Sequence, residues 1–310
     1  MRVVFMGTPE FAVPTLEILH NSVYDIAAVV TQPDRPKGRG QKLTASPVKE
    51  YACRNKLTVL QPEKVKNQEF IAQLHALSPD IIVVVAYGQI LSEEILTLPR
   101  YGCINVHASL LPKYRGAAPI HWALINGETK TGVTTMHMAK GLDTGDMILK
   151  VEIPITKEDT TGSLHTKLSE LGASLLLETV QQIAGGHAPR EPQDDTLATY
   201  APLLKREHEQ LVWGKTAEQL FNQTRGLNPW PGAYTTHRGR KLKIWRVELV
   251  AGNQLQLPGT ISKIDKVGII MATGEGLLRI LELQPENAKR MLAVDYARGH
   301  HLETGELMGV

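Results

Sequence analysis

The chain has 310 residues, which is more than one ordinary hydrophobic core accommodates, so two domains are expected. Hydrophobic residues make up 42% and charged residues 21%, which excludes a chain that is disordered over most of its length. The formal net charge is only +2, so total charge does not identify a nucleic-acid partner, and local clusters of cations must carry that information.

Cysteine usage and hydropathy indicate a cytoplasmic protein. Cys53 and Cys103 form neither a CxxC pair nor a Cys/His cluster with zinc spacing, so we expect two small buried side chains and no metal site. So few cysteines suit a reducing compartment. The N-terminus lacks the apolar stretch and cleavage site of a signal peptide, and the most apolar run, 81–86, is strand-sized, far short of the ~18 residues of a membrane span.

Short apolar runs alternate with helical patterns in the first half of the chain. Thr8 and Pro9 follow the first of these runs and are expected as a helix N-cap and first helical residue. The β-α-β order predicts an α/β domain with a Rossmann-like, mainly parallel sheet. Strands are expected at 3–6, 26–31, 58–60, 81–85 and 103–106, and helices at 46–56 and 68–77.

The second half predicts a change of architecture. A strand pair at 132–138 and 147–153 surrounds a loop at 139–146, and a helix is expected at 160–184. A polar, proline-containing stretch then predicts a linker. A helix at 216–225 and short strands over 232–284 predict an OB-like β-barrel. We expect a catalytic domain at 1–188, a linker at 189–205 and a C-terminal barrel domain at 206–310.

Three residue types with complementary chemistry gather where an open parallel sheet binds its ligands, beyond the carboxyl ends of its strands. Asn105 and His107 are two positions apart, so an extended backbone places them on one face. The loop at 139–146 adds Asp143. An amide, an imidazole and a carboxylate can together polarise a carbonyl and move a proton. By residue type alone, each could equally be a turn former, a cap or a structural hydrogen-bonding group.

Two short motifs are excluded as signals of other functions. GTPEF at 7–11 lacks the glycine repeat of a dinucleotide-binding fingerprint. Asp143-Thr144-Gly145 is the tripeptide of aspartic proteases, but those enzymes need two such aspartates that share a proton, and this chain has one copy.

Longer motifs resemble the folate-dependent formyltransferase family, in register from Val3 to about Leu281. They are NVHASLLPKYRGAAPI at 105–120, GLDTGD at 141–146, FMGTPEF at 5–11, VVVAYGQIL at 83–91 and NPWPGAY at 228–234. The resemblance implies that the chain transfers a formyl group from 10-formyltetrahydrofolate to an amine without a metal ion. It is strongest to the members that formylate methionyl initiator tRNA for translation initiation.

The resemblance also implies roles for individual residues. Asn105 would hydrogen-bond the formyl oxygen, His107 would shuttle the proton from the amine to the folate, and Asp143 would orient His107 and help to take the amine's proton. The implied folate contacts are Ser109, Leu110, Leu111, Pro112, Val85, Tyr87, Gly88 and Ile90.

Two basic clusters are the expected tRNA contacts. One lies in a segment rich in proline and glycine, 31–42, which indicates an exposed and mobile loop. The other follows a predicted strand at 241–250, where alternation places several cations on one face. Either could instead be an ordinary solvated surface. The expected contacts are Arg35, Lys37, Arg39 and Lys42 in the loop, with Arg39 resembling the family's acceptor-stem contact, and Arg238, Arg240, Lys241 and Lys243, with Arg246 nearby.

Two other functions remain open from the sequence. A formyltransferase for a small amine, such as an amino sugar nucleotide or a glycinamide ribotide, would not need the two basic clusters. A tRNA-binding protein without catalysis would not need Asn105, His107 and Asp143 together. The expected partners are initiator methionyl-tRNA and the folate donor, with no membrane contact, and the expected state is a monomer.

Overall fold

The computed structural model describes residues 1–37, 40, 42–252 and 255–309. By their contacts these residues divide into two compact units. The N-terminal unit comprises 1–116, 131–153 and 165–200, and the C-terminal unit comprises 117–130, 154–164 and 201–310. The chain therefore passes between the units several times. Over the described residues, no helix has both the length and the apolarity needed to cross a bilayer.

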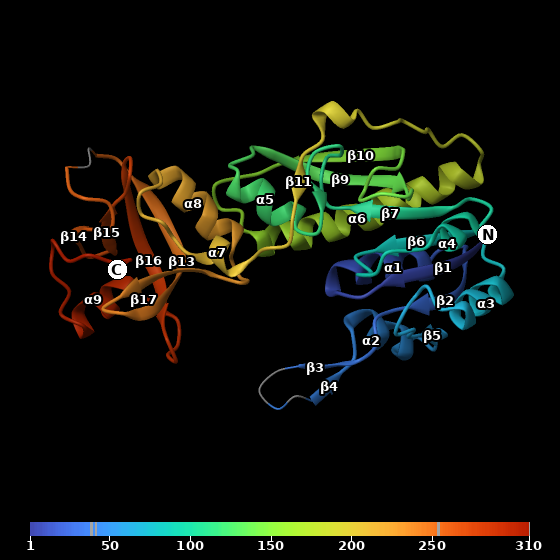
Figure 1. Cartoon of the computed structure of the whole chain (residues 1–310), viewed down its shortest axis with the longest axis horizontal. Helices are drawn as coiled ribbons and strands as arrows, with labels where there is room; N and C mark the ends of the chain where they lie inside the picture. Colours follow the sequence, from blue (N-terminus) through green and yellow to red (C-terminus); the bar gives the residue numbers. More distant parts are fainter. Residues whose placement is uncertain (38–39, 41, 253–254, 310) are drawn as a thin grey trace. The chain divides into compact units, whose positions relative to one another are not determined.

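The N-terminal unit is built on a mainly parallel sheet, which confirms the predicted α/β class (Figure 1). The strand order is β10-β9-β7-β6-β1-β2-β5, in which β7 pairs in parallel with β6 and antiparallel with β9. The strands are β1 Arg2–Gly7, β2 Asp25–Val30, β5 Val59–Leu60, β6 Ile81–Val85, β7 Cys103–His107, β9 Lys130–His137 and β10 Met147–Pro154.

Helices and a hairpin complete this unit. The β3–β4 hairpin, drawn in blue in Figure 1, projects from the unit beside α2. The elements are η1 Glu10–Ala12, α1 Val13–His20, β3 Arg35–Lys37, β4 Lys42–Thr44, α2 Pro47–Arg54, α3 Gln68–Leu77, α4 Glu93–Thr97, β8 Arg115–Gly116, α6 Thr161–Ala184 (from His165 in this unit), η2 Asp195–Leu197 and β11 Tyr200–Ala201.

Two local predictions are wrong. Thr8 does not cap a helix: Pro9 occupies the N-cap position of η1, and the Thr8 hydroxyl donates to the Tyr87 carbonyl at 3.0 Å. Cys53 is exposed, because α2 buries Val48 and Ala52 and the next residue along a helix points about 100° away. Cys103 is buried as predicted, and burial raises the pKa of its thiol to about 12.

The C-terminal unit is built on an antiparallel sheet of order β12-β13-β16-β15-β14, with β17 beside β16. Its alternating apolar residues pack with α8 and α9 into one core. Of the predicted OB-like β-barrel, an antiparallel β domain in this part of the chain is therefore confirmed. The elements are α5 Pro119–Ile125, α7 Arg206–Glu209, α8 Ala217–Gly226, β12 Ala233–His237, β13 Arg240–Val250, β14 Ile261–Ile264, β15 Ile269–Ala272, β16 Leu277–Pro285, β17 Met291–Leu292 and α9 Ala293–Gly299.

We expect Ile280→Ala to lower the free energy of unfolding of the C-terminal unit by about 2–5 kcal/mol, because truncating a buried side chain leaves a cavity. All 4 tryptophans lie in this unit, so their fluorescence during urea unfolding reports on it. The control is Val267→Ala at a side chain that is 54% exposed, with an expected change below about 0.5 kcal/mol. Equal effects of the two changes would contradict the core assignment.

Candidate active site

Strand β7 carries the first two predicted catalytic residues. Asn105 pairs in register with Val84 on β6, and His107 pairs with Thr134 on β9. Both side chains leave the same face of β7, and His107 ends the strand. The Asn105 side chain is partly exposed. Within the part of the chain that the structure describes, its amide has no hydrogen-bond partner and is available to a ligand.

The His107 imidazole is buried and oriented by two neighbours. Its Nε2 lies 2.9 Å from the Tyr114 carbonyl oxygen. Because a carbonyl only accepts, Nε2 must carry the proton of this hydrogen bond. Its Nδ1 lies 3.7 Å from Asp143 Oδ2. In the neutral ring Nδ1 is therefore the basic nitrogen, and once protonated it forms an ion pair with Asp143.

Asp143 is fixed by the backbone of two loops. Its own φ of 54° lies in the left-handed region, which is unfavourable for a non-glycine residue. Its Oδ2 accepts the Gly116 N–H at 2.8 Å. Gly145 allows the loop to close on β9, since an added Cβ would lie 1.8 Å from the His137 carbonyl oxygen. The structure thus places Asp143 beside His107, as the resemblance implies.

Three further groups orient this pair, and none of them could be predicted from the sequence. They are the Tyr114 carbonyl and the Gly116 amide, together with the Gln193 side chain, which donates to the Asp143 carbonyl at 2.8 Å. The first two are backbone groups, which no residue pattern reveals. Gln193 falls in the stretch interpreted as a linker.

The segment Ser109–Pro112 follows β7 and is tied down by Thr134. The Thr134 hydroxyl donates to the Ser109 carbonyl at 2.7 Å and accepts from the Leu111 N–H at 3.1 Å. Ser109 Oγ donates to the Lys113 carbonyl at 2.6 Å. Ser109 and Leu111 are buried, whereas Leu110 and Pro112 are partly exposed. Leu110 and Pro112 therefore have side-chain surface for a ligand.

The other expected folate contacts divide into buried and exposed residues. Val85 and Tyr87 are buried, and burial raises the pKa of the Tyr87 hydroxyl to about 12. Gly88, at a φ of 87°, is exposed, and Ile90 is 78% exposed. Of these four residues, only the exposed Gly88 backbone and the Ile90 side chain are therefore accessible to a ligand.

The basic loop begins as the β3–β4 hairpin. Its base is fixed by Asp34, which accepts from Lys49 Nζ at 2.7 Å and from Gln61 Nε2 at 2.9 Å. These hydrogen bonds lower the pKa of the Asp34 carboxyl. Arg35 is exposed and lies 3.6 Å from Glu63. Lys37 and Lys42 are paired in the backbone register, and Arg39 lies outside the described residues.

Several cations of the second basic cluster already have partners. Arg238 lies 3.0 Å from Glu306, and Lys241 lies 3.7 Å from Glu209 and 3.7 Å above the Tyr234 ring. Lys243 Nζ donates to the Pro231 carbonyl at 2.8 Å. Arg240 is exposed at the start of β13. Only part of the positive charge of this cluster is therefore uncompensated.

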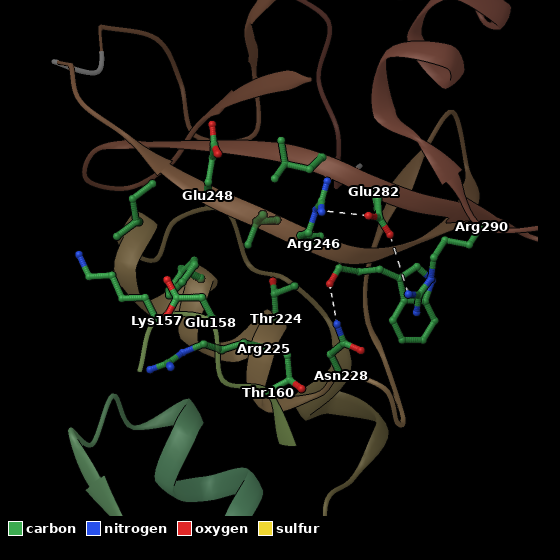
Figure 2. A pocket seen from close by; sticks show the side chains of 15 residues that line it. Lys157, Glu158, Thr160, Thr224, Arg225, Asn228, Arg246, Glu248, Glu282 and Arg290 are labelled. Atoms are coloured by element: carbon green, nitrogen blue, oxygen red, sulfur yellow. Dashed lines mark hydrogen bonds and ion pairs between the residues drawn. The ribbon is translucent and has the colours of Figure 1, made fainter. Parts of the chain in front are cut away.

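A hollow of about 650 Å³ belongs to the C-terminal unit and involves none of the predicted catalytic or folate-contacting residues (Figure 2). Glu282 bridges two of its arginines, 3.3 Å from Arg246 and 3.9 Å from Arg290. Arg290 also lies over the Trp245 ring. Glu282 therefore offsets part of the positive charge of these two arginines. Over the described residues, no group of three His, Cys, Asp or Glu side chains is arranged to hold a metal ion.

Comparison with known proteins gives one consistent result along the chain. The family model described as formyl transferase matches residues 1–180, and the one described as formyl transferase, C-terminal domain, matches residues 203–301. The chain is 54% identical to the methionyl-tRNA formyltransferase of Bacillus subtilis (strain 168) over 310 residues, which is 100% of this chain and 98% of that relative.

Solved structures with a similar fold are more distant in sequence. An N-formyltransferase from Helicobacter canadensis in complex with folinic acid and dTDP-3-aminofucose matches with a TM-score of 0.65 and 19% identity, covering 90% of this chain and 98% of its own. HypX from Aquifex aeolicus in complex with tetrahydrofolic acid matches with a TM-score of 0.62 and 14% identity over 96% of this chain, which spans 47% of HypX. At these identities the likeness shows the fold alone.

We expect Thr134→Val to destabilise the N-terminal unit by about 1–3 kcal/mol, because the buried Ser109 carbonyl and Leu111 N–H would lose their shared partner at almost unchanged volume. Urea unfolding followed by circular dichroism measures the change. Thr97→Val, at an exposed threonine of α4, is the control and should stay within about 0.5 kcal/mol of the wild type. A Thr134→Val protein as stable as this control would mean that the two hydrogen bonds contribute nothing.

Proposed function

Because this chain belongs to the formyl transferase family, we propose that Asn105, His107 and Asp143 catalyse its transfer of a formyl group from 10-formyltetrahydrofolate to the α-amino group of methionyl initiator tRNA. The product is N-formylmethionyl-tRNA for translation initiation. The observation that carries the catalytic assignment is the contact of the buried His107 imidazole with the partly buried Asp143 carboxylate, on the face of β7 that also carries Asn105. Identity above one half over the full chain supports the acceptor.

The reaction needs a donor that stabilises the oxyanion on the formyl oxygen and a base that takes the proton of the attacking amine. The neutral amine attacks the formyl carbon, and the formyl oxygen becomes an oxyanion. The Asn105 amide has a free N–H to donate to that oxygen, and one such donor typically contributes ~10²–10³ in rate.

His107 Nδ1 is the group that receives the amine's proton, because Nε2 is already committed to the Tyr114 carbonyl. The imidazolium that results is stabilised by Asp143 at 3.7 Å. His107 then donates the proton to N10 of the folate as the C–N10 bond breaks, so the enzyme returns to its starting state. Proton transfer of this kind typically contributes ~10²–10⁴.

The folate would lie against backbone and a few side chains. Ala86 and Gly88 are exposed beyond the end of β6, and both have positive φ, so the backbone between them turns away from the buried strand. A flat heterocycle can be read by such backbone groups. Leu110, Pro112 and Ile90 offer apolar surface, whereas Val85 and Tyr87 would act by shaping the turn.

The two basic clusters would bind the tRNA backbone without reading its sequence. The cations best placed for this are Arg240, which is exposed at the start of β13, and Arg35, whose partner Glu63 at 3.6 Å is itself exposed. By resemblance to the family, Arg39 would contact the acceptor stem of the tRNA. We also propose that the division into 1–188, 189–205 and 206–310 describes the functional domains, that the last of these binds tRNA, and that the enzyme acts as a cytoplasmic monomer.

We expect His107→Ala to lower kcat by about 10²–10⁴, because the group proposed to carry the proton from the amine to N10 of the folate is lost. The assay uses labelled 10-formyltetrahydrofolate with methionyl initiator tRNA, methionyl elongator tRNA and free methionine as acceptors. The control is His75→Ala, at an exposed histidine of α3, which should leave the rate unchanged. Near wild-type transfer by His107→Ala would refute the proton assignment. Transfer to small amines but to neither tRNA would favour the small-molecule alternative.

We expect Arg240→Ala to raise the KM for the tRNA and to reduce the slope of log affinity against log salt by about 1, with kcat and the folate KM unchanged. A lost phosphate contact weakens binding but does not alter the chemistry. Lys263→Ala, at an exposed lysine of β14 outside the basic clusters, is the control. An unchanged salt slope would mean that Arg240 does not contact the tRNA.

A further inference from the structure

The stretch interpreted as a linker is bound to the N-terminal unit over residues 190–199. Glu191 pairs with Met147 through both backbone hydrogen bonds, at 2.8 and 2.9 Å. Arg190 lies 3.2 Å from Asp146, and Thr199 hydrogen-bonds the turn at 114–115. We name residues 191–199 the strap. It runs from the loop that carries Asp143 to the turn that orients His107.

The Gln193 side chain is the centre of the strap. Its Nε2 donates to two carbonyls of the catalytic loop, Asp143 and Gly145, each at 2.8 Å. Its Oε1 accepts from Arg115 Nε at 3.0 Å. The amide cannot be turned the other way round, because its oxygen would then face two carbonyl oxygens and its NH₂ group would face a guanidinium. Both hydrogens and the oxygen of this amide are thus used.

Arg115 stabilises this orientation of the Gln193 amide. Its side chain is only 2% exposed, and its Nη2 also lies 2.7 Å from Asp195 of the strap. A buried guanidinium is costly unless its N–H groups are satisfied, so Arg115, Gln193 and Asp195 depend on one another. Asp195 itself is exposed, so the fixed member of this group is Arg115.

The C-terminal end of the strap, at Thr199, contacts the turn that orients His107. Thr199 Oγ1 accepts the Tyr114 N–H at 2.9 Å, and the Thr199 carbonyl accepts the Arg115 N–H at 2.8 Å. Tyr114, whose φ is 61°, presents its carbonyl to His107 Nε2. The strap therefore contacts the supports of both His107 and Asp143.

We propose that Gln193 is a positioning residue for Asp143, acting through the two carbonyls of its loop; this rests on the proposed role of Asp143 in formyl transfer. Asp143 has a left-handed backbone, which persists only where the surroundings fix it. Without the Gln193 donors the loop relaxes, and the carboxylate moves from His107 Nδ1. A displacement of about 1 Å in a catalytic group can cost about 10² in rate.

The test is a double-mutant cycle with Gln193→Met and Asp143→Asn in the full-length enzyme. Met is unbranched and similar in length to Gln but has no donor. Alone, Gln193→Met should lower kcat about 10²-fold while the KM values for folate and tRNA stay within about twofold. In the Asp143→Asn background it should change kcat by no more than about twofold, because residues that act as one unit are not additive.

Two further variants keep the test decisive. Leu197→Ala, at a strap side chain that is 61% exposed, is the matched control and should behave as wild type. Gln193→Asn retains an amide that stops one methylene short, and if Gln193→Met does not fold, Gln193→Asn takes its place in the cycle.

Additive losses of kcat in the double mutant, or a wild-type kcat for folded Gln193→Met, would overturn the positioning role. So would a loss confined to the KM for tRNA, which is what a merely structural linker would give. If Asp143→Asn alone keeps the wild-type kcat, it is the proposed catalytic role of Asp143 that fails, and the cycle separates that result from a failure of Gln193.

Discussion

The hydrogen bond from His107 Nε2 to the Tyr114 carbonyl is the interaction on which the rest of the site depends. It fixes the ring plane, and it leaves Nδ1 as the nitrogen that can gain and lose a proton. Asp143 lies on that side at 3.7 Å. In the other neutral tautomer the basic nitrogen would face the Tyr114 carbonyl oxygen, which has no proton to give, and the ring could not take a proton from the substrate at Nδ1. The order of proton transfers thus follows from one backbone oxygen.

Backbone geometry supplies much of the pre-organisation. Tyr114 and Asp143 both adopt positive φ, and each is fixed from outside its own loop, by Thr199 and by Gly116 and Gln193. Such conformations are costly for non-glycine residues and persist where surrounding contacts over-determine them. In this unit the contacts come from residues 27 to 85 positions away in the chain, so the site is assembled by tertiary structure and not by β7 alone.

In the C-terminal unit, most of the positive charge around β13 is already paired within the unit. Most arginines and lysines around β13 already face a glutamate, a carbonyl or an aromatic ring. Exposed ion pairs of this kind contribute little stability and are screened by salt. They can therefore exchange their partners for phosphates at small cost, whereas Arg240 offers its charge directly. Affinity for a nucleic acid would thus arise from a few exposed cations and not from the net charge of +2.

The amino-acid pattern was sufficient to predict the class of the sheet, the limits of most elements and, through the motif at 105–120, the family. The same motif led to the proposed catalytic residues Asn105 and His107. A short continuous apolar run such as Ile81–Val85 is typical of a buried strand of a parallel sheet, so the sheet class can be predicted from local sequence. Only the folded chain reveals that Thr8 hydrogen-bonds Tyr87 instead of capping a helix, and that Gln193 hydrogen-bonds the loop that carries Asp143. A side chain that binds carbonyls fifty residues away leaves no periodic or compositional trace, because its partners are backbone atoms that every residue possesses.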